Sequence, residues 1–191
     1  MAEVKALSFD LDEGMLGTLR QDFDIDKLTT TFAEAIAGKS SKEIEDIGKK
    51  LFSEYGQKWI KRARQLRDEF PDRTYEAIIK AIEDTNGYYK FSLLPQSILE
   101  VAYLGAFDLQ KLHIVENNHE RFIYMLEPDE CPMYDILIKK CSKEVVGLLP
   151  CKHACLTLLE TLHRDLELDA IVSMEATMPK DGYCRFVARR A

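Results

Sequence analysis

The sequence predicts an α+β fold in which an N-terminal helical part packs with an antiparallel sheet and further helices. Apolar residues in the first 87 positions recur at steps of three and four, the period of buried helical faces. Later segments are extended and joined by turn residues, as in β-hairpins. The resulting order of helices, hairpin, helices and hairpin is typical of an α+β protein with an antiparallel sheet, because a parallel sheet would alternate strands with helices.

Capping residues and apolar stripes define the helices of the first part. Asp26, Ser40 or Ser41, and Asp72 are N-cap candidates, and Pro71 and Asn86-Gly87 are stop signals. The predicted helices run from 26 to about 38, from 40 or 41 to 70, and from 72 to 86. The longest of them carries an apolar stripe that includes Trp59, so we expect these helices to be a structural scaffold.

The second part alternates between extended and helical patterns. Pro132 and Pro150 stand where the first turn of a helix begins, and Pro179 to Gly182 has the composition of a turn. The predicted elements are strands at 112–115 and 121–126, helices at 132–141 and 151–166, and strands at 170–174 and 184–188. We therefore expect a single domain, 1–191, with a helical scaffold portion (1–87) and an α+β, cysteine-containing portion (88–191) that carries the site.

Composition excludes several classes of protein. The chain has 191 residues, a formal charge of −7 and a pI near 5.2, which argues against nucleic acid as a partner. No stretch reaches the roughly 20 apolar residues of a membrane span, and the N-terminus lacks the pattern of a secretory signal. We expect a cytoplasmic protein with no membrane partner. Its five cysteines, an odd number, favour thiols or metal ligands over a disulfide framework.

The segment Phe9-Asp10-Leu11-Asp12 has the two aspartates of a DxD phosphatase loop. The residues that should follow the second aspartate in such a loop are absent, since Glu13-Gly14-Met15 stands there. We interpret the segment as a short acidic entry to the first helix.

The segment Pro150-Cys151-Lys152-His153-Ala154-Cys155 is the most informative in the chain. Cys151 and Cys155 share one face of the predicted helix, while His153 points away from both. With Cys184 or Glu175 from the following strands they form a candidate zinc set, although paired C-x-x-C motifs are absent. Cys151 also lies at a helix N-terminus, where backbone N–H groups favour a thiolate of lowered pKa. A structural role as a capping residue remains the alternative.

The C-terminal residues resemble two known families. Three segments are similar to proteins of the L-2-amino-thiazoline-4-carboxylic acid hydrolase type. They are Met178-Pro179-Lys180-Asp181-Gly182-Tyr183-Cys184-Arg185-Phe186, Cys131-Pro132 and the helix that starts at Cys151-Lys152-His153. The same layout resembles V4R (4-vinyl reductase) small-molecule-binding domains. There, cysteines and a glutamate hold zinc, and here Met178 stands where a further cysteine is expected.

The first resemblance implies a small hydrolase that acts on a compact sulfur- or nitrogen-containing carboxylate and opens a C–N or C–S ring. Cys151 and His153 then have catalytic roles. Cys131, Cys184 and Glu175 are the expected substrate-binding residues. The second implies a non-catalytic module that binds a small molecule, a metal through Cys151, Cys155, Glu175 and Cys184, or a tetrapyrrole. Zinc, iron, haem or no cofactor all remain open, and so does homo-oligomerisation.

Overall fold

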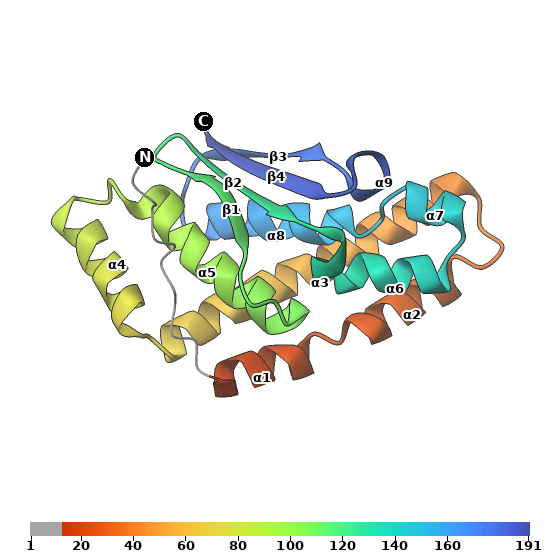
Figure 1. Cartoon of the computed structure of the whole chain (residues 1–191), viewed down its shortest axis with the longest axis horizontal. Helices are drawn as coiled ribbons and strands as arrows, with labels where there is room; N and C mark the ends of the chain where they lie inside the picture. The colour runs from red at the N-terminus through yellow and green to blue at the C-terminus, as the bar shows by residue number, and fades with distance from the viewer. Residues whose placement is uncertain (1–12) are drawn as a thin grey trace.

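The structure is a computed structural model that describes residues 13–191, and it has the predicted α+β fold (Figure 1). The segment with Asp10 and Asp12 lies outside the described residues. The helices are α1 (Glu13–Asp22), α2 (Ile25–Ala35), α3 (Ser41–Glu69), α4 (Arg73–Asp84), α5 (Lys90–Phe107), the 3₁₀ helix η1 (Pro128–Glu130), α6 (Pro132–Lys140), α7 (Lys143–Gly147), α8 (Lys152–Asp165) and α9 (Met178–Asp181). The strands are β1 (His113–Asn117), β2 (Arg121–Leu126), β3 (Ala170–Ala176) and β4 (Cys184–Arg190).

The four strands form one antiparallel sheet in the order β1-β2-β4-β3. Strand alternation sends Cys184 and Phe186 of β4 toward the helices and Arg185 toward the opposite face. On the inner face Phe186 is buried and its ring stacks on that of Tyr124, with centroids 5.1 Å apart. Figure 1 shows α8 running beneath this face, and α8 contacts β3. The leucine-rich helix therefore covers the apolar face of the sheet, as predicted.

Helices α3 and α8 pack in parallel at the centre of the helical layer. Gly48 of α3 lies against Pro150, Gly56 lies against Ala154, and the Arg64 guanidinium donates to the Asp165 carbonyl at 2.9 Å. A Cβ placed on Gly56 would lie 2.1 Å from the Ala154 carbonyl oxygen, so only glycine permits this approach. The contact fixes the start of α8, and with it Cys151, against the scaffold.

Helix α5 lies between α3 and the sheet. The indole N–H of Trp59 donates to the Ala102 carbonyl at 3.1 Å, and the Tyr103 ring packs against Tyr124 of β2. The α5 backbone departs from helical geometry at Ser92, whose φ is 71°, and becomes regular near Pro95. Figure 1 shows α1 and α2 on the side of the molecule away from the sheet.

Local chemistry explains where the predicted helices begin. Ser40 and Glu43 form a capping box at α3, and the Asp72 carboxylate accepts the Tyr75 N–H at α4, so both predicted caps are confirmed. Asp26 as the cap of α2 is wrong, because Asp24 accepts the Lys27 N–H at 2.9 Å.

The sequence pattern does not predict α1, α5, α7 or α9. Helix α5 is buried on most sides, so its apolar residues form no single stripe, and Pro95 further disguises it. Helix α9 replaces the turn predicted at 179–182, and it ends at Gly182 in the left-handed conformation. The element types of the C-terminal portion are otherwise as expected.

Candidate functional site

Four cysteines converge beneath the inner face of the sheet. Cys131 precedes α6, Cys151 precedes α8, Cys155 lies in the first turn of α8, and Cys184 begins β4. Each of them is buried. They lie close enough that negative charge on Cys131, Cys155 or Cys184 would raise the pKa of Cys151. The sequence predicts that Cys151 and Cys184 border one site, and the structure places them in the same buried region.

Two tyrosines complete this region. The hydroxyl groups of Tyr103 and Tyr124 are hydrogen-bonded at 2.8 Å, and both side chains are fully buried. A hydrogen bond to Tyr103 holds the pKa of the Cys155 thiol down, against the larger opposing effect of burial. We call these six residues the thiol–tyrosine cluster: Cys131, Cys151, Cys155, Cys184, Tyr103 and Tyr124.

Burial dominates the protonation of the four thiols. It raises the pKa of Cys131 and Cys151 well above the ordinary value, that of Cys155 to about 12 and that of Cys184 to about 11. The predicted thiolate of lowered pKa at Cys151 is therefore wrong. The helix N-terminus does not offset the loss of water, and the Lys152 ammonium is turned to the Leu148 carbonyl at 3.3 Å. All four thiols are protonated at neutral pH.

The candidate metal set is not assembled. Glu175 lies on the outer face of the sheet, where its carboxylate pairs with Arg189 at 2.6 Å and Arg185 at 3.7 Å. Cys184 faces the opposite side, so Glu175 neither joins the cysteines nor lines a site with them. Across residues 13–191, no three His, Cys, Asp or Glu side chains are grouped closely enough to hold a metal ion. The side chains present therefore do not fit a zinc or iron centre.

The His153 imidazole is partly buried, and charged groups of α3 and α8 act on it. Burial lowers its pKa, Lys152 and Lys49 lower it further, and Glu45 raises it. Lys49 and Glu45 belong to α3, and no cysteine is among the groups that shift this imidazole. The pairing of His153 with Cys151 as acid–base and nucleophile stays a prediction.

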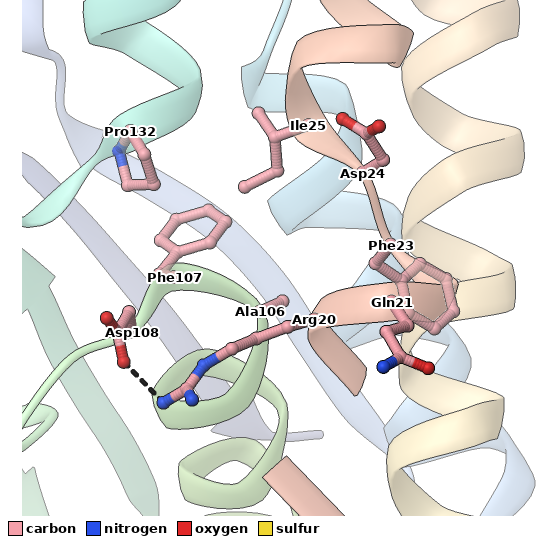
Figure 2. Close-up of a pocket in the computed structure, with 9 residues that line it drawn as sticks. All are labelled: Arg20, Gln21, Phe23, Asp24, Ile25, Ala106, Phe107, Asp108 and Pro132. Atoms are coloured by element: carbon pink, nitrogen blue, oxygen red, sulfur yellow. Dashed lines mark hydrogen bonds and ion pairs between the residues drawn. The ribbon is translucent and has the colours of Figure 1, made fainter. Parts of the chain in front are cut away.

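A pocket lies beside the thiol–tyrosine cluster, where the ends of four helices meet. Figure 2 shows the wall of this pocket, which we call the ligand pocket and which has a volume of about 390 Å³. It is lined by Arg20, Gln21, Phe23, Asp24, Ile25, Ala106, Phe107, Asp108 and Pro132. More than half of these residues belong to the N-terminal portion, for which the sequence predicts only a structural role.

The ligand pocket combines an apolar wall with an ion pair. The Arg20 guanidinium at the end of α1 donates to the carboxylate of Asp108, which follows α5 (Figure 2). Phe107, Ile25 and Pro132 provide the apolar surface next to this pair. Among the described residues, Asp108 is the only hydrogen-bonding or ionic partner of the Arg20 side chain. The pocket therefore presents this ion pair beside an apolar wall. A second acidic side chain of the lining, Asp24, accepts the Lys27 N–H at 2.9 Å as the cap of α2.

The ligand pocket and the thiol–tyrosine cluster share a wall. Phe107 lines the pocket and packs edge-on against Tyr103, with ring centroids 5.3 Å apart. Pro132 lines the pocket and directly follows Cys131. No sequence signal identifies Arg20 and Asp108 as partners, because 88 positions separate them and neither belongs to a motif.

One described stretch, Lys143–Asp165, is long and apolar enough to cross a membrane by length and composition alone. It comprises α7 and α8, and 56% of its most apolar 18-residue window is buried inside the protein, where α8 packs against α3 and β3.

The comparisons with known proteins leave the family open. No family model, no curated protein and no solved structure matches this chain.

Proposed function

We propose that this chain is a small-molecule-binding module whose ligand is a compact zwitterion of the amino-acid type. The ligand would lie in the ligand pocket, with its carboxylate on Arg20 and its ammonium or ring nitrogen on Asp108. The observation that carries the proposal is the isolated Arg20–Asp108 pair beside an apolar wall.

The size and chemistry of the pocket support this ligand class. A volume of about 390 Å³ is at the lower end of the range for small-molecule sites, roughly 300–1,000 Å³. Phe23, Ile25 and Phe107 suit an apolar or sulfur-containing side chain. The class also agrees with the compact sulfur- or nitrogen-containing carboxylate that the C-terminal resemblance implies.

Opening the ion pair costs little. Arg20 and Asp108 are both well exposed, with side chains 42% and 76% accessible, and pairs of this kind contribute roughly 0–1 kcal/mol. A zwitterion returns an opposite charge to each partner, so neither group is left uncompensated. A ligand with only one charge would leave either Arg20 or Asp108 without an opposite charge. The pocket therefore favours zwitterions over ligands that carry a single charge.

Binding without turnover fits the protonation of the thiols better than hydrolysis does. A thiol nucleophile needs a thiolate and a nearby base. Burial raises the pKa of all four clustered thiols, so none of them is a thiolate at neutral pH. Reduced, buried thiols suit a cytoplasmic location.

Trp59 provides a built-in test. It is the only tryptophan, it is fully buried, and its ring stacks on Phe107 of the ligand pocket with centroids 5.0 Å apart. We expect L-cysteine or L-leucine to change its fluorescence saturably, whereas the N-acetyl and amide derivatives bind at least about tenfold more weakly, since each loses one charged contact.

Two variants and one control complete this experiment. Arg20→Gln and Asp108→Asn should each weaken binding about tenfold without lowering the melting temperature. Asparagine also tolerates the left-handed conformation of residue 108, whose φ is 55°. Arg62→Gln is the matched control, because Arg62 pairs with Asp22 at 3.0 Å and does not line the pocket. Capped derivatives that bind as well as the free amino acids would refute the proposal.

A further inference from the structure

A second hollow lies at the end of the sheet, on a surface that shares no residue with the ligand pocket. It forms where the turn between β1 and β2 lies beside the last residues of β4 (Figure 1). We call it the arginine hollow, and its volume is about 650 Å³. It is lined by His119, Glu120, Arg121, Arg189, Arg190 and Ala191.

Two arginines of this hollow oppose each other directly. Arg121 of β2 and Arg189 of β4 are register partners in the antiparallel pair. Like charges directly opposite on a sheet are destabilising, so this position favours an anion between or above them. Each arginine has one carboxylate partner, Glu116 at 2.7 Å for Arg121 and Glu175 at 2.6 Å for Arg189. Neither of these glutamates lines the hollow.

The arginines that line the hollow keep free donor groups, and Arg190 is the third of them. No described residue forms a hydrogen bond or an ion pair with the Arg190 side chain. Arg121 bonds Glu116 through Nε, and Arg189 bonds Glu175 through one Nη, so the remaining N–H groups of both are unused by described residues. Glu120 is the only acidic side chain of the lining. The guanidinium groups of Arg121 and Arg189, side by side on one face of the sheet and with spare donors, match the bidentate geometry that phosphate groups accept.

An exposed aromatic ring, that of Tyr88, contacts one residue of the hollow's lining. Tyr88 and Tyr89, in the turn before α5, are 52% and 46% exposed, which is unusual for large aromatic side chains. The Tyr88 ring lies nearly parallel to that of His119, at 24° and with centroids 6.1 Å apart. Because His119 lines the hollow, this pair forms an aromatic platform at its rim. Such platforms bind nucleobases by stacking.

We propose that the arginine hollow is a mononucleotide site. Arg121 and Arg189 bind the phosphate groups. The base stacks on the platform formed by Tyr88 and His119. A hollow of about 650 Å³ lies within the size range of small-molecule sites. A single nucleotide is favoured over a nucleic-acid strand, because the chain carries a net charge of −7 and a strand needs a basic surface longer than one hollow.

The test compares ADP with its two halves. Isothermal titration calorimetry at low ionic strength should show ADP binding at least about tenfold more tightly than either inorganic pyrophosphate or adenosine, since only ADP uses both the arginines and the platform. ADP should also raise the melting temperature, as any ligand specific for the folded state does. Binding should weaken steeply with added salt, because the phosphate contacts are exposed.

Variants separate the two halves of the site. Arg121→Gln/Arg189→Gln should weaken ADP binding more than about tenfold, and Tyr88→Ala should weaken it about fivefold. Removing opposed like charges relieves repulsion, so the double variant should stay folded by circular dichroism. Arg164→Gln, at an arginine that is 62% exposed near the end of α8, and Phe70→Ala, at an aromatic that is 43% exposed after α3, are the matched controls. Both should leave the dissociation constant within about 1.5-fold of the unmodified protein.

Three results would overturn the proposal. The first is the absence of ADP binding at millimolar concentration. The second is ADP affinity that survives the double arginine variant. The third is a combination of two results: pyrophosphate binds as tightly as ADP, and Tyr88→Ala leaves the ADP affinity unchanged. The hollow would then be a site for any small anion.

Discussion

Replacing Gly56 with alanine should be among the most damaging small changes in the scaffold. The new Cβ would lie 2.1 Å from the Ala154 carbonyl oxygen and 2.8 Å from its carbon, and both are backbone atoms of α8. Favourable contacts between heavy atoms begin near 3.5 Å, so α3 and α8 would have to separate by roughly 1 Å. A backbone atom cannot rotate away as the end of a long side chain can. The whole helix pair must therefore shift.

The magnitude follows from two opposing effects. Overpacking of a well-packed core costs about 1–3 kcal/mol, and more where backbone is involved. Alanine in a helix recovers up to about 1 kcal/mol relative to glycine. Because the clash is with backbone, we take the upper end of the first range and expect a net loss of about 2 kcal/mol, which for a chain of this length lowers the melting temperature by about 4–8 °C. Circular dichroism during urea and thermal unfolding measures both quantities.

Gly17 provides the matched control, since it also lies in a helix but has open space, with no heavy atom within 4 Å, where the alanine Cβ would lie. Gly17→Ala should stabilise the protein by up to about 1 kcal/mol. If Gly56→Ala proves as stable as the unmodified protein while Gly17→Ala behaves as expected, the close approach of α3 and α8 is not the one described.

Three further predictions concern single side chains. Trp59→Ala should cost about 3–5 kcal/mol, because the ring is fully buried and its N–H bonds the Ala102 carbonyl, and a melting temperature near that of the unmodified protein would contradict this burial. Iodoacetamide should label the half-buried Cys141 before Cys151, because Cys151 is buried and burial raises its pKa much further. Peptide mapping measures the order of labelling, and faster labelling of Cys151 would support an activated thiolate at that residue. Burial raises the pKa of Glu100 from 4.5 to about 7, so the stability contributed by its proton is complete below pH 4.5 and is lost as the pH rises through 7. Glu100→Gln should therefore stabilise the protein at pH 8 by up to about 3 kcal/mol and change little near pH 4.5, and equal effects in urea unfolding at both pH values would show that the carboxyl keeps its ordinary pKa.

Local signals explain which parts of the fold were predictable. Ser40 and Asp72 mark helix starts through their own side chains, and the alternation of β4 places Cys184 and Phe186 on one face whatever the rest of the chain does. The position of Cys151 at the start of a helix that must cover the sheet was enough to bring it near Cys184. These inferences need only the residues of one element and its neighbour.

The remaining features depend on contacts between distant segments. The helix dipole at Cys151 is visible in the sequence, but the burial that overrides it arises only when α8 packs against α3 and the sheet. Glu175 adjoins Ala176 and a bulge in the β3–β4 pairing, and only the paired strand shows that its carboxylate meets Arg189 on the outer face. The Arg20–Asp108 pair joins two helix ends with no shared motif. For this reason the ligand pocket was not predictable.

The parallel packing of α3 and α8 also bears on how the chain folds. About 100 residues separate Gly56 from Ala154, and this contact forms only when that whole segment has closed into a loop. Proteins dominated by such non-local contacts fold more slowly than bundles of sequential helices. Helices α3 and α4 can form early from local signals, whereas the cysteines cannot be shielded from water until α8 reaches α3. The thiols are thus exposed for longest in the newly made chain, and oxidation during synthesis is a greater hazard to them than oxidation after folding.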